Sequence, residues 1–217
     1  MRAAAVIITI VVTVAAMARV SAACPGCGGK RSDSMQAAQA GFDKAHASFL
    51  AHAASVLKLS PDRILVSPIE EDSSVQLDQR IGAAWAFYGS SKDQPNRQVR
   101  GWAIGDGTVI TPDKNLGLLL AEAGVWSGKP KLDADALAER LAWAMGMNHR
   151  VVGPRSLHVD PGGKGTLSFQ VAYRPPGPGG AGGGRERISQ CTVTLTADHH
   201  ARLATTAVAT PPGPSFE

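Results

Sequence analysis

The chain has 217 residues, of which 44% are hydrophobic, 18% are charged and 5% are aromatic. This length is enough for one large domain or two small ones. The formal charge is +4 and no run of Lys or Arg exceeds two residues. The sequence therefore lacks the dense basic patch of a nucleic-acid-binding protein.

Residues 1–23 have the layout of a secretory signal peptide. Arg2 gives a basic start, an apolar run spans 3–18, and the small residues Ser21 and Ala23 occupy the −3 and −1 positions for signal peptidase. We expect cleavage after Ala23 and a secreted or periplasmic protein. Loss of the two arginines in this segment would lower the formal charge from +4 to +2.

Two alternatives to simple secretion remain open at this N-terminus. The first is an uncleaved membrane anchor, although the apolar run is shorter than the ~20 residues that a transmembrane helix needs. The second is a membrane-anchored lipoprotein, because Cys24 directly follows two alanines, as in a bacterial lipoprotein box. The resemblance to that box is incomplete, since Ser21 stands where such boxes carry Leu, Val or Ile.

The three cysteines, Cys24, Cys27 and Cys191, make an odd count that an exported chain must accommodate. If Cys24 is acylated, Cys27 and Cys191 are left to form a disulfide. If the protein is simply secreted, Cys24 and Cys27 pair and Cys191 stays a buried thiol, which is our expectation. The Cys-Pro-Gly-Cys string does not favour redox catalysis, because it precedes a flexible linker rather than opening a helix after a strand.

The first predicted helix starts at Asp33, with Gln36 completing a capping box, and runs to about Leu57. A short strand follows at 63–69. The residues expected on the buried face of the helix are Ala38, Phe42, Ala45, Phe49, Ala53 and Val56.

A β-meander follows, with strands near 84–88, 99–104 and 108–111 and a tight turn at Gly105-Asp106-Gly107. Trp85 and Trp102 fall on neighbouring strands, where we expect them to pack in the core and to be close enough to stack across the sheet. The alternative is that both face outward and form a platform for a ligand or a glycan.

Two further helices are predicted from their capping residues. Thr111 should cap one, with Pro112 at its first position and Gly124 at its end. Asp133 should cap the other, which Gly146 terminates.

The rest of the chain is predicted to be β-structure, with a Gly/Pro-rich loop over 174–187 that cannot bury enough side chain to order itself. The expected strands are 157–159, 166–173, 188–196 and 201–208.

The predicted fold class is therefore α+β, with helices packed on antiparallel sheets in a tandem helix-plus-meander repeat. This arrangement resembles the cystatin-like and PepSY-like layout of exported binding or inhibitory modules. The resemblance is one of layout and carries no site residues. The predicted segments are a signal peptide (1–23), a flexible linker (24–32), a first half (33–127), a second half (132–210) and a disordered tail (211–217).

Asp198, His199 and His200 form the strongest candidate metal cluster, with His158 or Asp160 as further ligands or catalytic groups. A solvated hairpin turn explains the same residues more simply. An envelope metal-binding protein or hydrolase is therefore the alternative function.

The main functional prediction is an exported, non-enzymatic binding module of the bacterial cell envelope that needs no cofactor. The sequence contains no Gly-x-Ser-x-Gly or His-Glu-x-x-His motif. We expect the partner to be a protein or an envelope ligand, bound through a face or an edge of a sheet. Contact with a membrane is expected only through an N-terminal lipid or an uncleaved signal.

Overall fold

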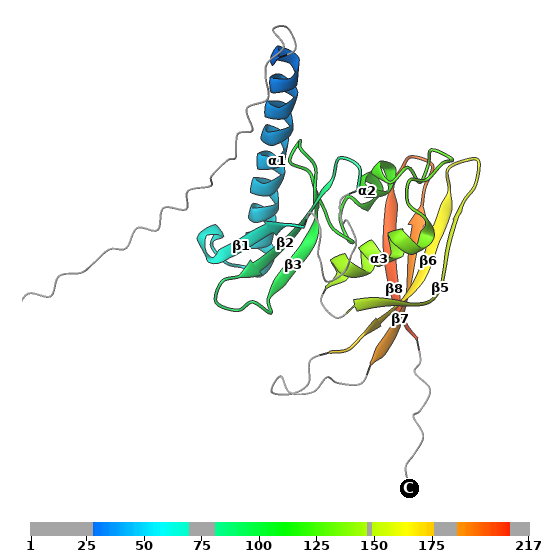
Figure 1. Ribbon diagram of the computed structural model, residues 1–217. Coiled ribbons are helices and arrows are strands. Elements are labelled where there is room, and N and C mark those ends of the chain that lie inside the picture. The colour runs from blue at the N-terminus through cyan, green and yellow to red at the C-terminus, as the bar shows by residue number, and fades with distance from the viewer. Residues whose placement is uncertain (1–27, 70–80, 147–148, 176–185, 209–217) are drawn as a thin grey trace, which may run out of the picture. The chain divides into compact units, whose positions relative to one another are not determined.

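The computed structural model describes residues 28–69, 81–146, 149–175 and 186–208 (Figure 1). The chain divides into two compact units, Met1–Gln36 and Ala37–Glu217. The second unit holds every described strand. The predicted signal peptide and tail lie outside the described residues, as does most of the predicted loop at 174–187.

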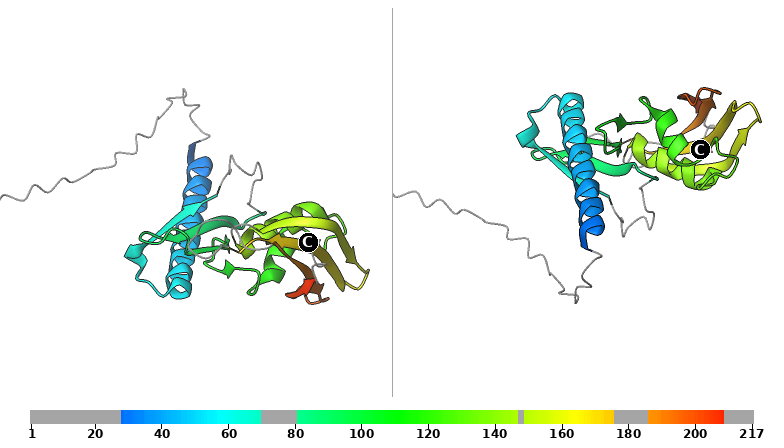
Figure 2. Two further views of the ribbon diagram at one scale, coloured as in Figure 1. Left: turned by 90° about the horizontal axis from the view of Figure 1, so that it is seen from below. Right: turned by 90° about the horizontal axis from the view of Figure 1, so that it is seen from above.

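The β-structure consists of two four-stranded antiparallel sheets, each a meander in which strands pair with their neighbours in sequence (Figures 1 and 2). The first sheet contains β1 (Ile64–Pro68), β2 (Trp85–Ser91), β3 (Gln98–Ala103) and β4 (Val109–Ile110). The second contains β5 (His149–Val159), β6 (Gly165–Tyr173), β7 (Arg187–Leu195) and β8 (Ala201–Val208).

The described helices are α1 (Gly28–Leu57), α2 (Leu116–Glu122) and α3 (Ala134–Met145), with a short 3-10 helix at Pro61–Arg63. The α+β fold class is thereby confirmed. A helix followed by a four-stranded meander occurs twice along the chain, while the tandem repeat itself stays a prediction.

Helix α1 packs on one face of the first sheet. Its apolar stripe follows a spacing of four residues and consists of Ala45, Phe49, Ala53 and Leu57. The ring of Phe49 stacks on Phe87 of β2, with ring centroids 5.3 Å apart. Val56, which the sequence placed on this face, is exposed instead, because the stripe continues from Ala53 to Leu57. Ala38, also expected on this face, is exposed as well.

A second hydrophobic cluster joins the opposite face of the first sheet to α2, α3 and one face of the second sheet, called here the inner face. Trp102 of β3 is fully buried in this cluster, so its predicted core position is confirmed. Trp85 belongs to the α1 side, where its ring meets Phe42 edge to face. The predicted stacking of Trp85 on Trp102 is therefore wrong: Trp102 lies opposite Ala86, the residue after Trp85, and side chains alternate between faces.

Helix α3 forms as its capping residues predict. The Asp133 carboxylate accepts a hydrogen bond from the Ala136 N–H at 2.8 Å, and Gly146 is the C-cap. Arg155 of β5 lies 3.5 Å from the carboxylates of both Asp135 and Glu139, which ties α3 to the second sheet.

Three predicted boundaries need correction. Helix α1 begins at Gly28, so Asp33 lies inside the helix. Helix α2 begins at Leu116 rather than at Pro112, because Thr111 and Lys114 exchange backbone hydrogen bonds in a turn. Strand β5 begins at His149, because a β-bulge keeps the residues before and after Gly153 in one strand.

Candidate functional site

The predicted cleavage site after Ala23 and the disulfide or lipidation site at Cys24 and Cys27 lie outside the described residues. Residues 28–32 of the predicted linker lie in helix α1. Cys191 is a buried free thiol in the described structure. In the part of the chain that is described, no helix combines the length and the apolar character needed to cross a membrane.

Asp198, His199 and His200 form the turn between β7 and β8. The Thr196 hydroxyl donates a hydrogen bond to Asp198 at 2.5 Å and lowers the pKa of that carboxyl. The Asp198 carboxylate lies 3.6 Å from the His200 Nε2, whereas the His199 ring stacks on Trp126 with centroids 4.8 Å apart. The turn thus brings Asp198 and His200 together, and His199 packs separately.

Of the three residues proposed as metal ligands, the turn therefore brings only Asp198 and His200 close together. Within the described ranges, no group of three or more His, Cys, Asp or Glu residues gathers closely enough to hold an ion. The His199 ring has a packing role against Trp126, and the Trp126 indole donates a hydrogen bond to the Gly163 carbonyl at 2.8 Å.

Sheet edges are potential interaction sites, because an edge strand presents unpaired N–H and C=O groups. Three of the four edges have features that discourage pairing. Strand β1 is short and ends at Pro68, and β4 has only two residues. Strand β5 carries a bulge with Gly153 at φ 66°, followed by Pro154 and the charged Arg155.

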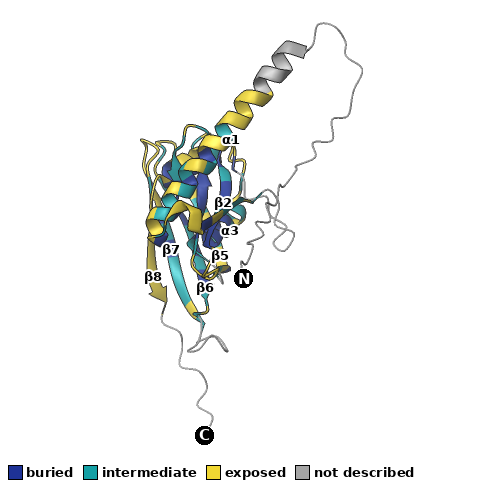
Figure 3. Ribbon diagram, turned by 90° about the vertical axis from the view of Figure 1, so that its left-hand side faces the viewer, coloured by how far each residue is buried: buried dark blue, intermediate teal, exposed yellow. Residues whose placement is uncertain are grey.

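Strand β8 is the exception. It has eight residues, contains neither Gly nor Pro, and its single charged residue is Arg202. Among the described residues β8 pairs with β7 alone, and residues 204–208 are all exposed. Figure 3 shows this exposed strand at the margin of its sheet.

The hydrogen-bond pattern identifies which backbone groups of β8 are available. The turn closes with a bond from the Thr196 N–H to the His200 carbonyl at 3.0 Å. Because bonded and non-bonded pairs alternate in an antiparallel ladder, the even-numbered residues from 202 to 208 bond to β7. Between residues 202 and 208, the residues whose N–H and C=O point to the free edge are Leu203, Thr205 and Ala207.

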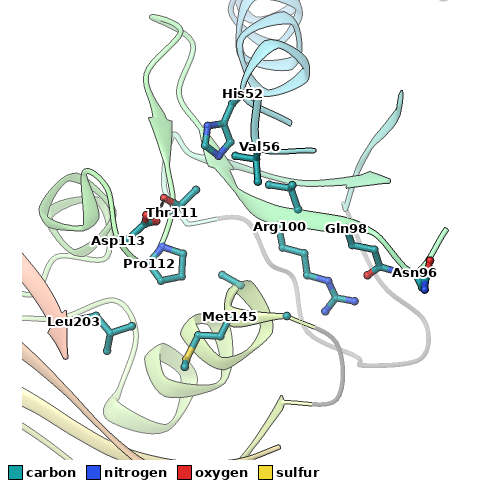
Figure 4. A pocket seen from close by; sticks show the side chains of 13 residues that line it. His52, Val56, Asn96, Gln98, Arg100, Thr111, Pro112, Asp113, Met145 and Leu203 are labelled. Atoms are coloured by element: carbon teal, nitrogen blue, oxygen red, sulfur yellow. Dashed lines mark hydrogen bonds between the residues drawn. The ribbon is translucent and has the colours of Figure 1, made fainter. Parts of the chain in front are cut away.

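The side chains of these three residues lie on the inner face, since Leu203 and Thr205 are opposite the buried Val193 and Cys191. Two hollows adjoin them there. The first hollow has a volume of about 510 Å³ and includes Leu203 in its wall (Figure 4). The second hollow has a volume of about 470 Å³ and includes Thr205 and Ala207. Met145 lines both hollows and therefore lies between them.

The first hollow combines apolar walls with a few polar groups. Val56 is 53% exposed here, and Pro112 and Leu203 face it from other elements (Figure 4). The Arg100 guanidinium lies 5.7 Å from the centre of the Trp143 ring and donates a hydrogen bond to the Trp143 carbonyl at 3.3 Å. Arg100 is thus held by an aromatic ring at the wall of the hollow.

His52 enters the first hollow from α1. Burial lowers the pKa of its imidazole, the nearby Lys114 lowers it further, and Asp113 opposes both effects. The Thr111 hydroxyl in the same hollow donates its hydrogen bond to Asp113 at 2.5 Å. This contact ties the hydroxyl to a carboxylate rather than to His52, so the arrangement does not form a hydroxyl nucleophile activated by an imidazole.

The second hollow is mainly apolar and aromatic. The rings of His149 and Tyr173 stack in its wall, with centroids 4.7 Å apart and an interplanar angle of 17°. Val171 and Met145 add apolar surface, and the exposed Arg187 supplies a positive charge. Such a wall can hold a large apolar side chain.

Comparison of the chain with protein-family models, with curated proteins and with solved structures finds no match. The functional proposal below therefore rests on the geometry of β8 and the two hollows. Sequence reasoning identified β8 as a strand but missed both hollows, whose walls come from residues far apart in the chain. The one local signal was the lack of charge after Arg202 in β8.

Proposed function

We propose that this protein is an exported, non-enzymatic binding module of the bacterial cell envelope, and that it binds a protein partner by strand addition at β8. The observation that carries this proposal is the contrast between β8 and the other three sheet edges. Strand β8 is long, almost uncharged and exposed over residues 204–208, whereas the others are short, bulged or interrupted by proline.

Strand addition uses the groups that β8 leaves available. A partner segment in extended conformation would bond to the N–H and C=O groups of Leu203, Thr205 and Ala207. Backbone bonds of this kind provide affinity, and adjoining pockets provide specificity through alternate side chains.

The outer face of the second sheet favours an edge over a face as the binding surface. Its central side chains already bond to one another: Gln190 donates to Ser168 at 2.8 Å, and Gln170 donates to Gln190 at 3.2 Å. Displacing these bonds would cost free energy that a partner must recover with bonds of its own.

The exported location is supported by the order of residues in 1–23. The test is to express the full chain in a bacterium, fractionate the cells and measure the mass of the intact protein by mass spectrometry. An N-terminus at Cys24 in the periplasm or medium supports export, and an added acyl mass would identify the lipoprotein form. A cytosolic product that keeps Met1–Ala23 would refute export.

Strand addition is tested by selecting displayed random peptides on the purified protein and measuring their affinity for two variants. Thr205→Pro removes an N–H that points to the free edge and should cost no backbone bond to β7, while the side-chain bond of Thr205 to Cys191 is lost. Thr205→Ala is the matched control, because it removes the hydroxyl and keeps the N–H.

We expect the selected peptides to bind Thr205→Ala like the wild type and to bind Thr205→Pro at least about tenfold more weakly. Hydrogen exchange should show new protection of the Leu203, Thr205 and Ala207 amides in the complex. Equal affinity for both variants, or failure to select any peptide, would refute strand addition.

A further inference from the structure

We infer that the segment added to β8 carries two large apolar side chains four residues apart, with a small residue midway between them and acidic residues at its ends. This inference rests on the proposed strand addition and names the chemistry of the partner. Its basis is the placement of the two hollows along the strand.

The spacing follows from the strand period. A residue added opposite Leu203 places its side chain on the inner face beside the first hollow, and one opposite Ala207 does so beside the second. Leu203 and Ala207 are four residues apart, and opposite residues keep this spacing in either strand direction. The segment therefore needs its large side chains at positions i and i+4.

The middle position is restricted by Met145. The residue opposite Thr205 points to the inner face at the end of the second hollow nearer to the first, and Met145 marks that boundary because it lines both hollows. A small side chain at i+2 fits beside Met145, whereas a large one would have to displace it. Residues at i+1 and i+3 point to the outer face and are not restricted by the hollows.

The wall chemistry favours apolar side chains at both large positions. The second hollow offers the stacked His149 and Tyr173 rings, and the first offers Val56 and Pro112. Aromatic and branched aliphatic side chains bury the most apolar area in such sites.

The positive charges near both ends of β8 favour acidic residues at the ends of the partner segment. Arg202 is exposed at the start of β8, and Arg187 is exposed beside the second hollow near the end of β8. Among the described residues that line the two hollows, Asp113 is the only acidic one. A segment with Glu or Asp at each end therefore complements the site, and one with Lys or Arg is disfavoured.

The test uses three synthetic peptides labelled for fluorescence anisotropy. The first carries Phe at i and i+4, Ser at i+2, Thr at the outward positions and Glu at both ends. The second has the same composition with the second Phe moved to i+3, which turns that ring to the outer face. The third replaces both Glu residues of the first by Lys.

We expect the first peptide to bind at least about tenfold more tightly than the second, and several-fold more tightly than the third at low salt. On the protein, Ala207→Trp should fill the second hollow and weaken the first peptide about tenfold. Ala204→Trp is the matched control, because residue 204 lies on the same strand with its side chain on the other face.

The outcomes separate this inference from the proposed function. Equal binding of all three peptides, still lost on Thr205→Pro, would leave strand addition standing and overturn the partner chemistry. Absence of binding, or binding that Thr205→Pro does not affect, would overturn both. If sedimentation shows a dimer of the wild type that dissociates in Thr205→Pro, the edge binds a second copy of this chain, and the inference is overturned.

Discussion

The indole of Trp102 meets the indole of Trp143 edge to face, with ring centroids 5.4 Å apart. Trp102 comes from β3 and is fully buried, while Trp143 comes from α3 and is 8% exposed. This pair joins the first sheet to the helix that covers the second sheet. Edge-to-face pairs add about 0.5–1.5 kcal/mol to the free energy of burial.

Trp102→Ala should lower the free energy of unfolding by about 3–5 kcal/mol, because it leaves a large cavity in the shared cluster. Trp85→Ala is the comparison. Trp85 is only half-buried on the α1 side, so this substitution should lower the free energy of unfolding by less. Urea unfolding of both variants measures the difference. Similar losses for the two would show that the Trp102 contact does not hold the sheet to α3.

Two helical glycines should respond to alanine with opposite signs. A Cβ at Gly117 of α2 would lie 2.1 Å from the His199 carbonyl oxygen, so Gly117→Ala must push α2 away from the β7–β8 turn. We expect a loss of about 1–3 kcal/mol, as for other overpacked sites. A Cβ at Gly41 of α1 would lie 3.6 Å from its nearest neighbours, which is ordinary contact.

Gly41→Ala should therefore stabilise the protein by up to about 1 kcal/mol, the usual advantage of alanine in a helix. Urea unfolding at fixed temperature measures both variants. Stabilisation by Gly117→Ala would mean that α2 does not rest on the turn as described.

The features predicted correctly from the sequence are those that neighbouring residues determine. Asp133 and Gly146 define helix α3 because a cap needs only a side chain and the adjacent backbone. The prediction for α2 failed although Thr111 and Pro112 form an equally good local signal. There the backbone of Thr111 bonds to Lys114, and Asn115 at φ 59° precedes the helix.

The candidate site depends on long-range packing, which is why the sequence did not reveal it. Strand β8 was predicted correctly, but only the assembled sheet shows that it lies at an edge. The first hollow needs His52, Arg100, Met145 and Leu203 from four different elements. No spacing rule connects residues so far apart in the chain.

The Cys191 thiol should resist alkylation in the folded protein. Its side chain is fully buried on β7, opposite Thr205 of β8, and burial raises the pKa of the thiol. Because the thiolate is the reactive form, both burial and the raised pKa slow the reaction. Iodoacetamide followed by peptide mass spectrometry should label Cys191 only after denaturant is added.

Labelling of Cys191 without denaturant would show that β8 opens readily from β7. Recovery of a Cys27–Cys191 peptide after non-reducing digestion would refute the expected pairing of Cys24 with Cys27. The two results come from separate experiments: alkylation is carried out without denaturant, and the disulfide is mapped by digestion without reductant.

His52 should make the protein less stable in mild acid. Burial and Lys114 hold the pKa of its imidazole below the ordinary value of about 6.5. Above that pH the ring is neutral in both the folded and the unfolded chain and contributes nothing. As the pH falls below about 6.5, the unfolded chain takes up the proton first, so stability declines until the folded pKa is passed.

His52→Gln should therefore lose less stability than the wild type between about pH 7.5 and about pH 5, as measured by urea midpoints. The neighbouring charges give two further variants of opposite sign. Lys114→Gln should raise the pKa of His52 and flatten the pH dependence, and Asp113→Asn should lower the pKa and steepen it. NMR titration of the His52 ring follows each shift directly. If His52→Gln shows the wild-type pH dependence, another group is responsible for the acid sensitivity.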